Sequence, residues 1–252
     1  MSRALFCLGI RELYSDEWAF SGRLAKACIN QSVWHEESIQ KRPEAWMAIS
    51  AISNGYPCCQ AFLGQKIQPA TAPAADIVEV FRQTVGNLFW CMETQQSTWL
   101  NCQKSDSVQT FGPEQDLTSE PADLDVHRMF EMFRNGATEL DPILSSILAP
   151  GTHSEIRDLV TSGEDAFRFS SELWVRTLYD FAASYHHDVI NRDHLVQALI
   201  PLYRGMTYSF LLEHSDSSPT QMEAANENLC AEFVRQKTYL TELWNAKIEV
   251  KS

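Results

Sequence analysis

What this 252-residue sequence lacks excludes several classes of protein. It has no run of 18 apolar residues, the length a helix needs to cross a bilayer, so we expect no transmembrane segment. Glycine and proline number only 10 each, which excludes collagen-like and low-complexity chains. Basic residues are scarce, because 20 Lys and Arg oppose 33 Asp and Glu for a net charge of -13. A nucleic-acid binder needs cations that displace phosphate counterions, so we expect no nucleic-acid partner.

Common catalytic and metal-binding motifs are missing as well. The sequence contains no G-x-S-x-G, no P-loop and no G-x-G-x-x-G, and H-E-x-x-H begins at His35 without a second histidine. Cys58 and Cys59 lie in an apolar run without an adjacent base, which favours an inert buried pair over a reactive thiol. His186 and His187 could bind a divalent ion, but histidine near the end of a helix more often interacts with the helix dipole.

The seven cysteines are odd in number and form no C-x-x-C pair. Most have apolar neighbours, as buried thiols have in a reducing compartment. The apolar run 4–10 resembles a short signal peptide, but Arg11 and Glu12 stand where a cleavage site would begin. The sequence therefore favours a cytoplasmic protein.

The residues that are present predict a mainly helical fold. Hydrophobic residues make up 44% of the chain and aromatic residues 11%, enough to build a core. Periodic apolar positions, with Pro43 opening the second segment, predict helices at 21–30, 43–53, 74–100, 122–135, 139–148, 153–161, 171–187, 191–213 and 219–246. The second half is the acidic one, since residues 114–252 carry 23 acidic against 11 basic residues.

Strands are few. The segment 56–63 predicts one short strand, whereas a sheet that stands alone needs several. Residues 1–70 therefore resemble the rim of a sheet whose centre is missing. Residues 103–120 are polar and rich in turn formers, so we divide the chain into a first domain at 1–104 and an all-α domain at 105–252.

Four single residues in the second domain carry local predictions. Asn191 and Ser218 are expected to cap helix N-termini. Pro201 is expected to kink the helix that contains it. Gly205 has no side chain and is expected to let a neighbouring helix approach closely.

Acidic residues near two helix starts are the remaining candidates for chemistry. Asp16 and Glu17 precede the first long helix, and Glu44 lies in the first turn of the next. Carboxylates there usually complement the helix dipole. If the two helix starts converge on a cleft, the same groups could bind an acceptor or act as a general base.

Several stretches, taken together, resemble a known enzyme family. The sequence is similar to the acceptor-side half and helical tail of GT-A-type (family 2-like) glycosyltransferases related to glucosylglycerate and mannosylglycerate synthases. The matching stretches are 20–25, 44–46, 60–66, 81–86, 174–185, 199–210 and 233–244. The resemblance implies a mainly α fold, in which a remnant of the GT-A α/β half packs on a helical bundle.

The resemblance also implies a site. In the family, a Rossmann-like half with a D-x-D acid pair on a strand holds the sugar nucleotide and its metal, and this sequence predicts no such strand with an acid pair. Gln68 stands where the family has a metal-binding histidine, and an amide is a poor ligand for Mg²⁺ or Mn²⁺. On the resemblance, the acceptor-side acids would be Glu17 and Glu44, and the acceptor-binding residues Ser21, Arg23, Trp46 and Lys66.

Three functions follow as expectations. The first is a glycosyltransferase-family chain without its own donor or metal site, and hence with no cofactor in isolation. The second is half of a split transferase, completed by a donor-binding partner chain that brings Mg²⁺ or Mn²⁺ with a nucleotide sugar. The third is a non-catalytic acidic helical protein that binds a partner or forms a homodimer. The sequence identifies neither the sugar nor the acceptor.

Overall fold

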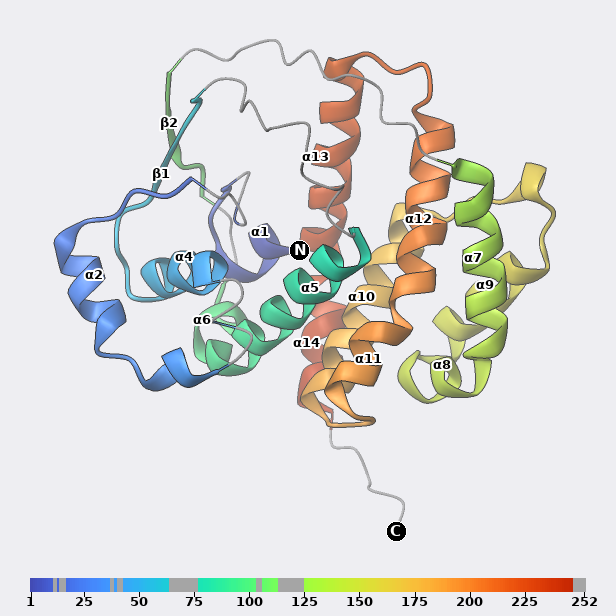
Figure 1. Cartoon of the computed structure of the whole chain (residues 1–252), viewed down its shortest axis with the longest axis horizontal. Coiled ribbons are helices and arrows are strands. Elements are labelled where there is room, and N and C mark those ends of the chain that lie inside the picture. The colour runs from blue at the N-terminus through green and yellow to red at the C-terminus, as the bar shows by residue number, and fades with distance from the viewer. Residues whose placement is uncertain are drawn as a thin grey trace. The chain divides into compact units, whose positions relative to one another are not determined.

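The structure is a computed structural model that describes residues 1–10, 13, 17–36, 39, 43–63, 77–102, 106–112 and 125–246. The described residues are mainly helical, as the sequence predicts, and form two short strands. The chain divides into two compact units, Met1–Thr118 (unit 1) and Ser119–Ser252 (unit 2) (Figure 1). Among the described residues, no helix has both the length and the apolar character needed to cross a membrane.

Unit 1 contains short helices and a pair of strands. Its elements are α1 (Ser2–Phe6), α2 (Gly22–Ile29), the 3₁₀ helix η1 (Ser32–His35), α4 (Pro43–Ser53), β1 (Cys59–Ala61), α5 (Ile77–Thr94), α6 (Gln96–Leu100) and β2 (Gln109–Phe111).

Helix α4 begins and ends where the sequence predicts. Pro43 opens it, and Gly55 follows its end with φ 69°, a left-handed conformation that glycine adopts without a steric cost. The Tyr56 N–H donates to the Ala51 carbonyl at 2.9 Å, and the Gly55 N–H donates to the Ile52 carbonyl at 3.0 Å. These bonds satisfy carbonyls that the end of a helix would otherwise leave unpaired.

Strands β1 and β2 are parallel and lie side by side (Figure 1). Their register pairs Gln60 with Thr110, and the Gln60 amide donates to the Thr110 hydroxyl at 3.1 Å. The predicted strand 56–63 is thus confirmed in its centre, at Cys59–Ala61. Strand β2, which the sequence did not predict, lies beyond residue 104 and belongs to unit 1.

The predicted helix 74–100 is two helices, because the chain leaves helical geometry at Gln95. Helix α6 turns back on α5, and the buried Trp99 indole N–H donates to the Met92 carbonyl at 2.9 Å. Periodicity did not predict this break, because the apolar spacing continues across it.

Two cysteine predictions are corrected. Cys7 and Cys102 form a disulfide across a sequence separation of 95 residues, with Cα atoms 5.5 Å apart. The other five cysteines, Cys28, Cys58, Cys59, Cys91 and Cys230, are free. The predicted burial of the Cys58–Cys59 pair is wrong, because Cys59 is exposed and Cys58 only half-buried at the short strand β1. The sequence analysis predicted reduced thiols from the apolar neighbours of the cysteines along the chain. Such neighbours do not reveal a disulfide partner 95 residues away.

Unit 2 is a helical bundle. Its elements are α7 (Val126–Glu139), α8 (Asp141–Ile147), α9 (Pro150–Thr161), the 3₁₀ helix η2 (Glu164–Ala166), α10 (Ser171–His186), α11 (Arg192–Ala198), α12 (Ile200–Glu213), α13 (Pro219–Arg235) and α14 (Lys237–Asn245).

Helix α10 lies at the centre of unit 2. It is buried along most of its length and packs against α8, α9, α11, α13 and α14. Its start is fixed by the Ser170 hydroxyl, which accepts the Leu173 N–H at 3.2 Å. The predicted caps Asn191 and Ser218 are confirmed in the same way at the starts of α11 and α13.

Helices α7 and α12 approach each other at two glycines. A Cβ on Gly205 would lie 2.5 Å from the Phe133 ring, and a Cβ on Gly136 would lie 2.6 Å from Cγ of Pro201. Each glycine therefore faces a bulky side chain of the other helix. This confirms the close approach predicted for Gly205.

Two predictions for long helices in unit 2 are wrong. The segment 191–213 is two helices, and Pro201 lies in the first turn of the second, where its missing N–H costs no hydrogen bond. It therefore helps to start α12 rather than kinking a longer helix. The segment 219–246 likewise divides at Gln236 into α13 and α14.

Candidate functional site

The predicted acceptor-side residues of unit 1 lie on and before helices α2 and α4, which pack against each other. Ser21 caps α2, since its hydroxyl accepts the Leu24 N–H at 3.2 Å. The Arg23 guanidinium lies 5.1 Å from the centre of the Tyr56 ring, a cation–π distance. Glu44 is in the first turn of α4, and Glu17 is exposed in the segment before α2. Ser21 and Arg23 thus already have structural partners.

Trp46 is a core residue. Its side chain is only 2% exposed, and its ring meets Trp34 edge-to-face with centroids 5.0 Å apart. The Trp34 indole N–H donates in turn to the Cys28 carbonyl at 2.8 Å. In this conformation Trp46 holds α4 against its neighbours and offers no ring surface to an acceptor.

Three of the predicted positions lie outside the described residues: Asp16, Lys66 and Gln68. Within the described ranges, no group of three or more His, Cys, Asp or Glu side chains is arranged to hold a metal ion. No metal-dependent step is assigned to the described residues.

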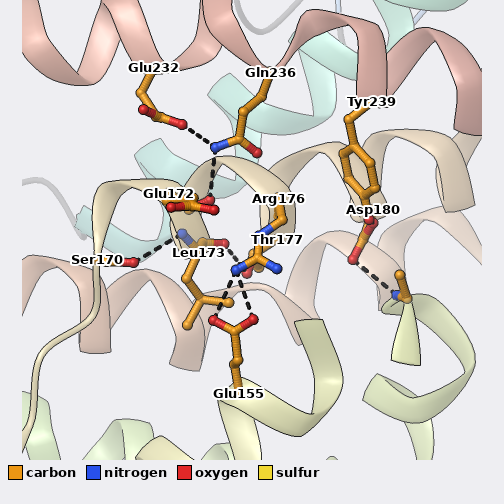
Figure 2. A network of polar contacts seen from close by, with 11 residues as sticks. Glu155, Ser170, Glu172, Leu173, Arg176, Thr177, Asp180, Glu232, Gln236 and Tyr239 are labelled. Carbon is orange, nitrogen blue, oxygen red and sulfur yellow. Dashed lines mark hydrogen bonds and ion pairs between the residues drawn. The ribbon is translucent and has the colours of Figure 1, made fainter. Parts of the chain in front are cut away.

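A group of polar contacts in unit 2 joins several helices around the buried Asp180 side chain. We call it the helix-joining network, and Figure 2 shows most of it; its members are Thr152, Glu155, Glu172, Arg176, Tyr179, Asp180, Phe233, Gln236 and Tyr239, with the Ala149 N–H. They come from α9, α10, α13 and α14.

Asp180 is the centre of this network. Its side chain is almost wholly buried, and its carboxylate accepts the Ala149 N–H at 3.0 Å and the Tyr239 hydroxyl (Figure 2). Burial raises the pKa of Asp180, while the bonds from Tyr239, Ala149 and Thr152 oppose that rise. Because Ala149 is the N-cap of α9, the carboxylate also faces the positive end of that helix.

Arg176 extends the network toward solvent. Its Nη2 lies 2.8 and 2.9 Å from the two carboxylate oxygens of Glu155, which ties α10 to α9 (Figure 2). Its Nε is buried and has no hydrogen-bond partner among the described residues. The positive charge favours the ionised form of Asp180 one helical turn away.

Two further bonds attach α13 to α10. The Tyr179 hydroxyl donates to the Phe233 carbonyl at 2.6 Å, and burial raises the pKa of Tyr179. The Gln236 amide, at the junction of α13 and α14, donates to the Glu172 carbonyl at 3.2 Å. Beside it, burial lowers the pKa of Lys237 to about 8.

The histidines considered for a metal site have other roles. The His187 Nε2 lies 3.0 Å from the Leu243 carbonyl oxygen, which can only accept, so the imidazole N–H is the donor of this hydrogen bond. The His186 ring stacks on Trp244, with centroids 4.0 Å apart and planes 10° apart. Both contacts fasten the end of α10 to α14.

These contacts define what the helix-joining network does chemically. The Asp180 carboxylate receives three donors, and Tyr179 and Tyr239 are held as protonated donors by their raised pKa values. Groups that satisfy one another in this way orient helices and are not poised to transfer a proton. The network therefore holds α9, α10, α13 and α14 in register.

Sequence reasoning missed this network, although a signal was present. An aspartate at position 180, within an otherwise apolar stretch of a helix, must be buried with partners. The sequence does not say which residues those partners are. No protein-family model, no curated protein and no solved structure matches this chain.

Proposed function

We propose that this chain is the acceptor-side and helical part of a sugar-nucleotide-dependent glycosyltransferase, and that a separate chain supplies the donor site. The family resemblance supports this proposal, because its matching stretches occur in both units. Part of the resemblance, including the positions of Lys66 and Gln68, lies outside the described residues.

The observation that carries the proposal is the parallel pair β1–β2. Parallel strands normally lie within larger sheets that are covered on both faces. Here the strand residues are exposed except for Gln60, which is half-buried. Phe111 in β2 is 49% exposed, and Leu63, two residues beyond β1, is 76% exposed. A partner that covers these apolar side chains and adds parallel strands would complete a sheet of the nucleotide-binding type.

In this proposal the chain contributes acceptor recognition. Glu17 is exposed, and Glu44 lies on the helix that packs against α2, so both could meet an acceptor hydroxyl at the rim of a completed site. The donor half would bring the nucleotide sugar with Mg²⁺ or Mn²⁺, whose charge neutralises a diphosphate leaving group. Orientation of the acceptor is the share of catalysis that remains to this chain.

Isothermal titration tests the missing donor site directly. The purified chain is titrated with UDP-glucose or GDP-mannose in the presence of MnCl₂, and we expect no metal-dependent binding. Clear binding that EDTA abolishes would show that the chain carries its own donor site, and this part of the proposal would be wrong.

The partner is tested by co-expression with the product of the neighbouring reading frame, if that frame encodes an α/β chain with a D-x-D pair. We expect a stable complex that transfers labelled sugar, and Phe111→Ser should weaken assembly. Leu212→Ser is the matched control, because Leu212 is a similarly exposed apolar residue (42%) of unit 2. A neighbouring frame without such a chain, or equal loss of assembly in both variants, would count against the proposal.

A further inference from the structure

In unit 1, a disulfide and two backbone hydrogen bonds join the segment 7–9, which follows α1, to residues 102 and 106. Cys7 forms the disulfide with Cys102. The Asp106 N–H donates to the Cys7 carbonyl at 2.8 Å, and the Gly9 N–H donates to the Asp106 carbonyl at 2.8 Å. Leu8 and Asp106 thereby form a parallel bridge. One covalent and two hydrogen bonds therefore hold this segment.

The backbone of Cys7 is in an unfavourable conformation. Cys7 follows α1 with φ 60° and ψ 11°, in the left-handed region that glycine and asparagine usually occupy at the end of a helix. A residue with a Cβ tolerates this conformation only where its surroundings impose it. The disulfide and the two hydrogen bonds are the contacts at hand to do so.

Helix α1 has an anchor of its own. Ala4, Leu5 and Phe6 are at most 3% exposed, and α1 packs against α4 and α6. Loss of the disulfide therefore leaves the apolar side chains of α1 in place. What it releases is the short segment after α1 and its pairing with Asp106.

We propose that the Cys7–Cys102 disulfide is a redox-controlled clasp, which locks residues 7–9 onto Asp106 when oxidised and lets this pairing open when reduced. The proposal is independent of the proposed function.

The chemistry is thiol–disulfide exchange with glutathione. In closing, the thiolate of one cysteine attacks a sulfur of oxidised glutathione and releases one glutathione thiolate. The second cysteine thiolate then attacks the mixed disulfide and releases the other. Two electrons pass from the cysteines to glutathione, and the two cysteine protons go to water or to the released thiolates. In opening, two reduced glutathione molecules reverse these steps.

The clasp acts next to strand β2. Asp106 precedes the first residue of β2, Gln109, by three positions, and β2 pairs with β1. With the clasp closed, the segment that leads into β2 is fixed at its start by Cys7 and Gly9. With the clasp open, the segment keeps its pairing with β1 but loses the bonds to Cys7 and Gly9, so the redox state sets the order of this part of unit 1.

Hydrogen–deuterium exchange in glutathione buffers tests this on the full chain. Mass spectrometry first follows the peptide that joins Cys7 to Cys102 as the ratio of reduced to oxidised glutathione increases. We expect the amides of Gly9 and Asp106 to exchange at least about tenfold faster in the reduced chain, while amides of α4 keep their protection. Cys7→Ser should show the fast exchange at every ratio.

Cys59→Ser is the matched control, because Cys59 is an exposed free thiol at the start of β1. It should respond to glutathione as the unaltered chain does. Three results would overturn the proposal: absence of the joined peptide under oxidising conditions, exchange at Gly9 and Asp106 that ignores reduction, or loss of protection throughout α4 on reduction. The last would identify a structural staple whose loss unfolds unit 1.

Discussion

Substituting Gly205 by alanine tests the close packing of α7 on α12. The added Cβ would lie 2.5 Å from Cδ2 and 2.8 Å from Cγ of Phe133. Both distances are below 3.0 Å, and real Cβ atoms essentially never lie that close to a neighbouring atom. The Phe133 ring is fully buried and meets Phe167 and Phe169 edge-to-face at 5.0 and 6.2 Å. It therefore cannot move away into solvent.

The expected loss follows from two opposing terms. Alanine favours a helix interior over glycine by about 1 kcal/mol, whereas overpacking a rigid core costs about 1–3 kcal/mol and sometimes more. Because the contact is with a buried ring and not with a flexible chain end, we expect a net loss of about 2 kcal/mol in the free energy of unfolding. For a urea m-value of about 2 kcal/mol per M, the midpoint of unfolding falls by about 1 M.

Urea unfolding followed by circular dichroism measures this loss, with Gly151→Ala as control. Gly151 is also helical and in unit 2, but a Cβ there would meet no atom within 4 Å. That variant should be neutral or slightly more stable. The double variant Gly205→Ala with Phe133→Leu should recover at least about 1 kcal/mol relative to the sum of the single changes. Equal stability of Gly205→Ala and the unaltered chain would refute the packing described for α7 and α12.

Two further predictions concern the helix-joining network. Asp180→Ala should lower the free energy of unfolding by about 3–5 kcal/mol, because it leaves the part-buried Ala149 N–H and Tyr239 hydroxyl without their acceptor. Asp158→Ala, at an exposed position of α9, should change it by less than about 0.5 kcal/mol. Burial lowers the pKa of Lys237 from 10.5 to about 8, so between these pH values the folded chain binds fewer protons than the unfolded chain. The free-energy cost of burying the charged amine is therefore full below pH 8 and disappears as the pH rises to 10.5. Unfolding titrations of the unaltered chain and Lys237→Met should therefore show the unaltered chain gaining stability relative to the variant across that range, and parallel pH curves would contradict the assignment.

Local sequence signals predicted local structure well. Ser218 and Asn191 cap helices because a side-chain oxygen can reach N–H groups two or three residues along the chain. The close approach at Gly205 follows from its missing side chain, although its partner Phe133 could not be named. The prediction for Pro201 was wrong because the effect of a proline depends on its position: it kinks a helix from the interior but is well tolerated in the first turn, where Pro201 lies.

Contacts between distant residues explain most of what the sequence did not predict. The hydroxyl of Tyr239 and the carboxylate of Asp180 are 59 positions apart, and Cys7 and Cys102 are 95 apart. No periodicity or spacing pattern tells which remote residue a buried polar group will meet. Strand β2 was missed for the same reason, because three exposed residues become a strand only through their pairing with β1.

The roles of the network residues limit what the family resemblance can say about chemistry. In its C-terminal stretches, Tyr179, Asp180, Tyr239 and Trp244 hold helices together through hydrogen bonds and a stacked histidine. These residues have structural roles in the helical fold. Sequence similarity to the family at these positions is therefore evidence about architecture and not about chemistry. A sugar-transfer function has to be judged in unit 1, where Glu17 and Glu44 lie. Loss of transfer in a reconstituted complex on Glu44→Gln, with assembly unchanged, would support a chemical role there, whereas unchanged transfer would confine Glu44 to the first turn of α4.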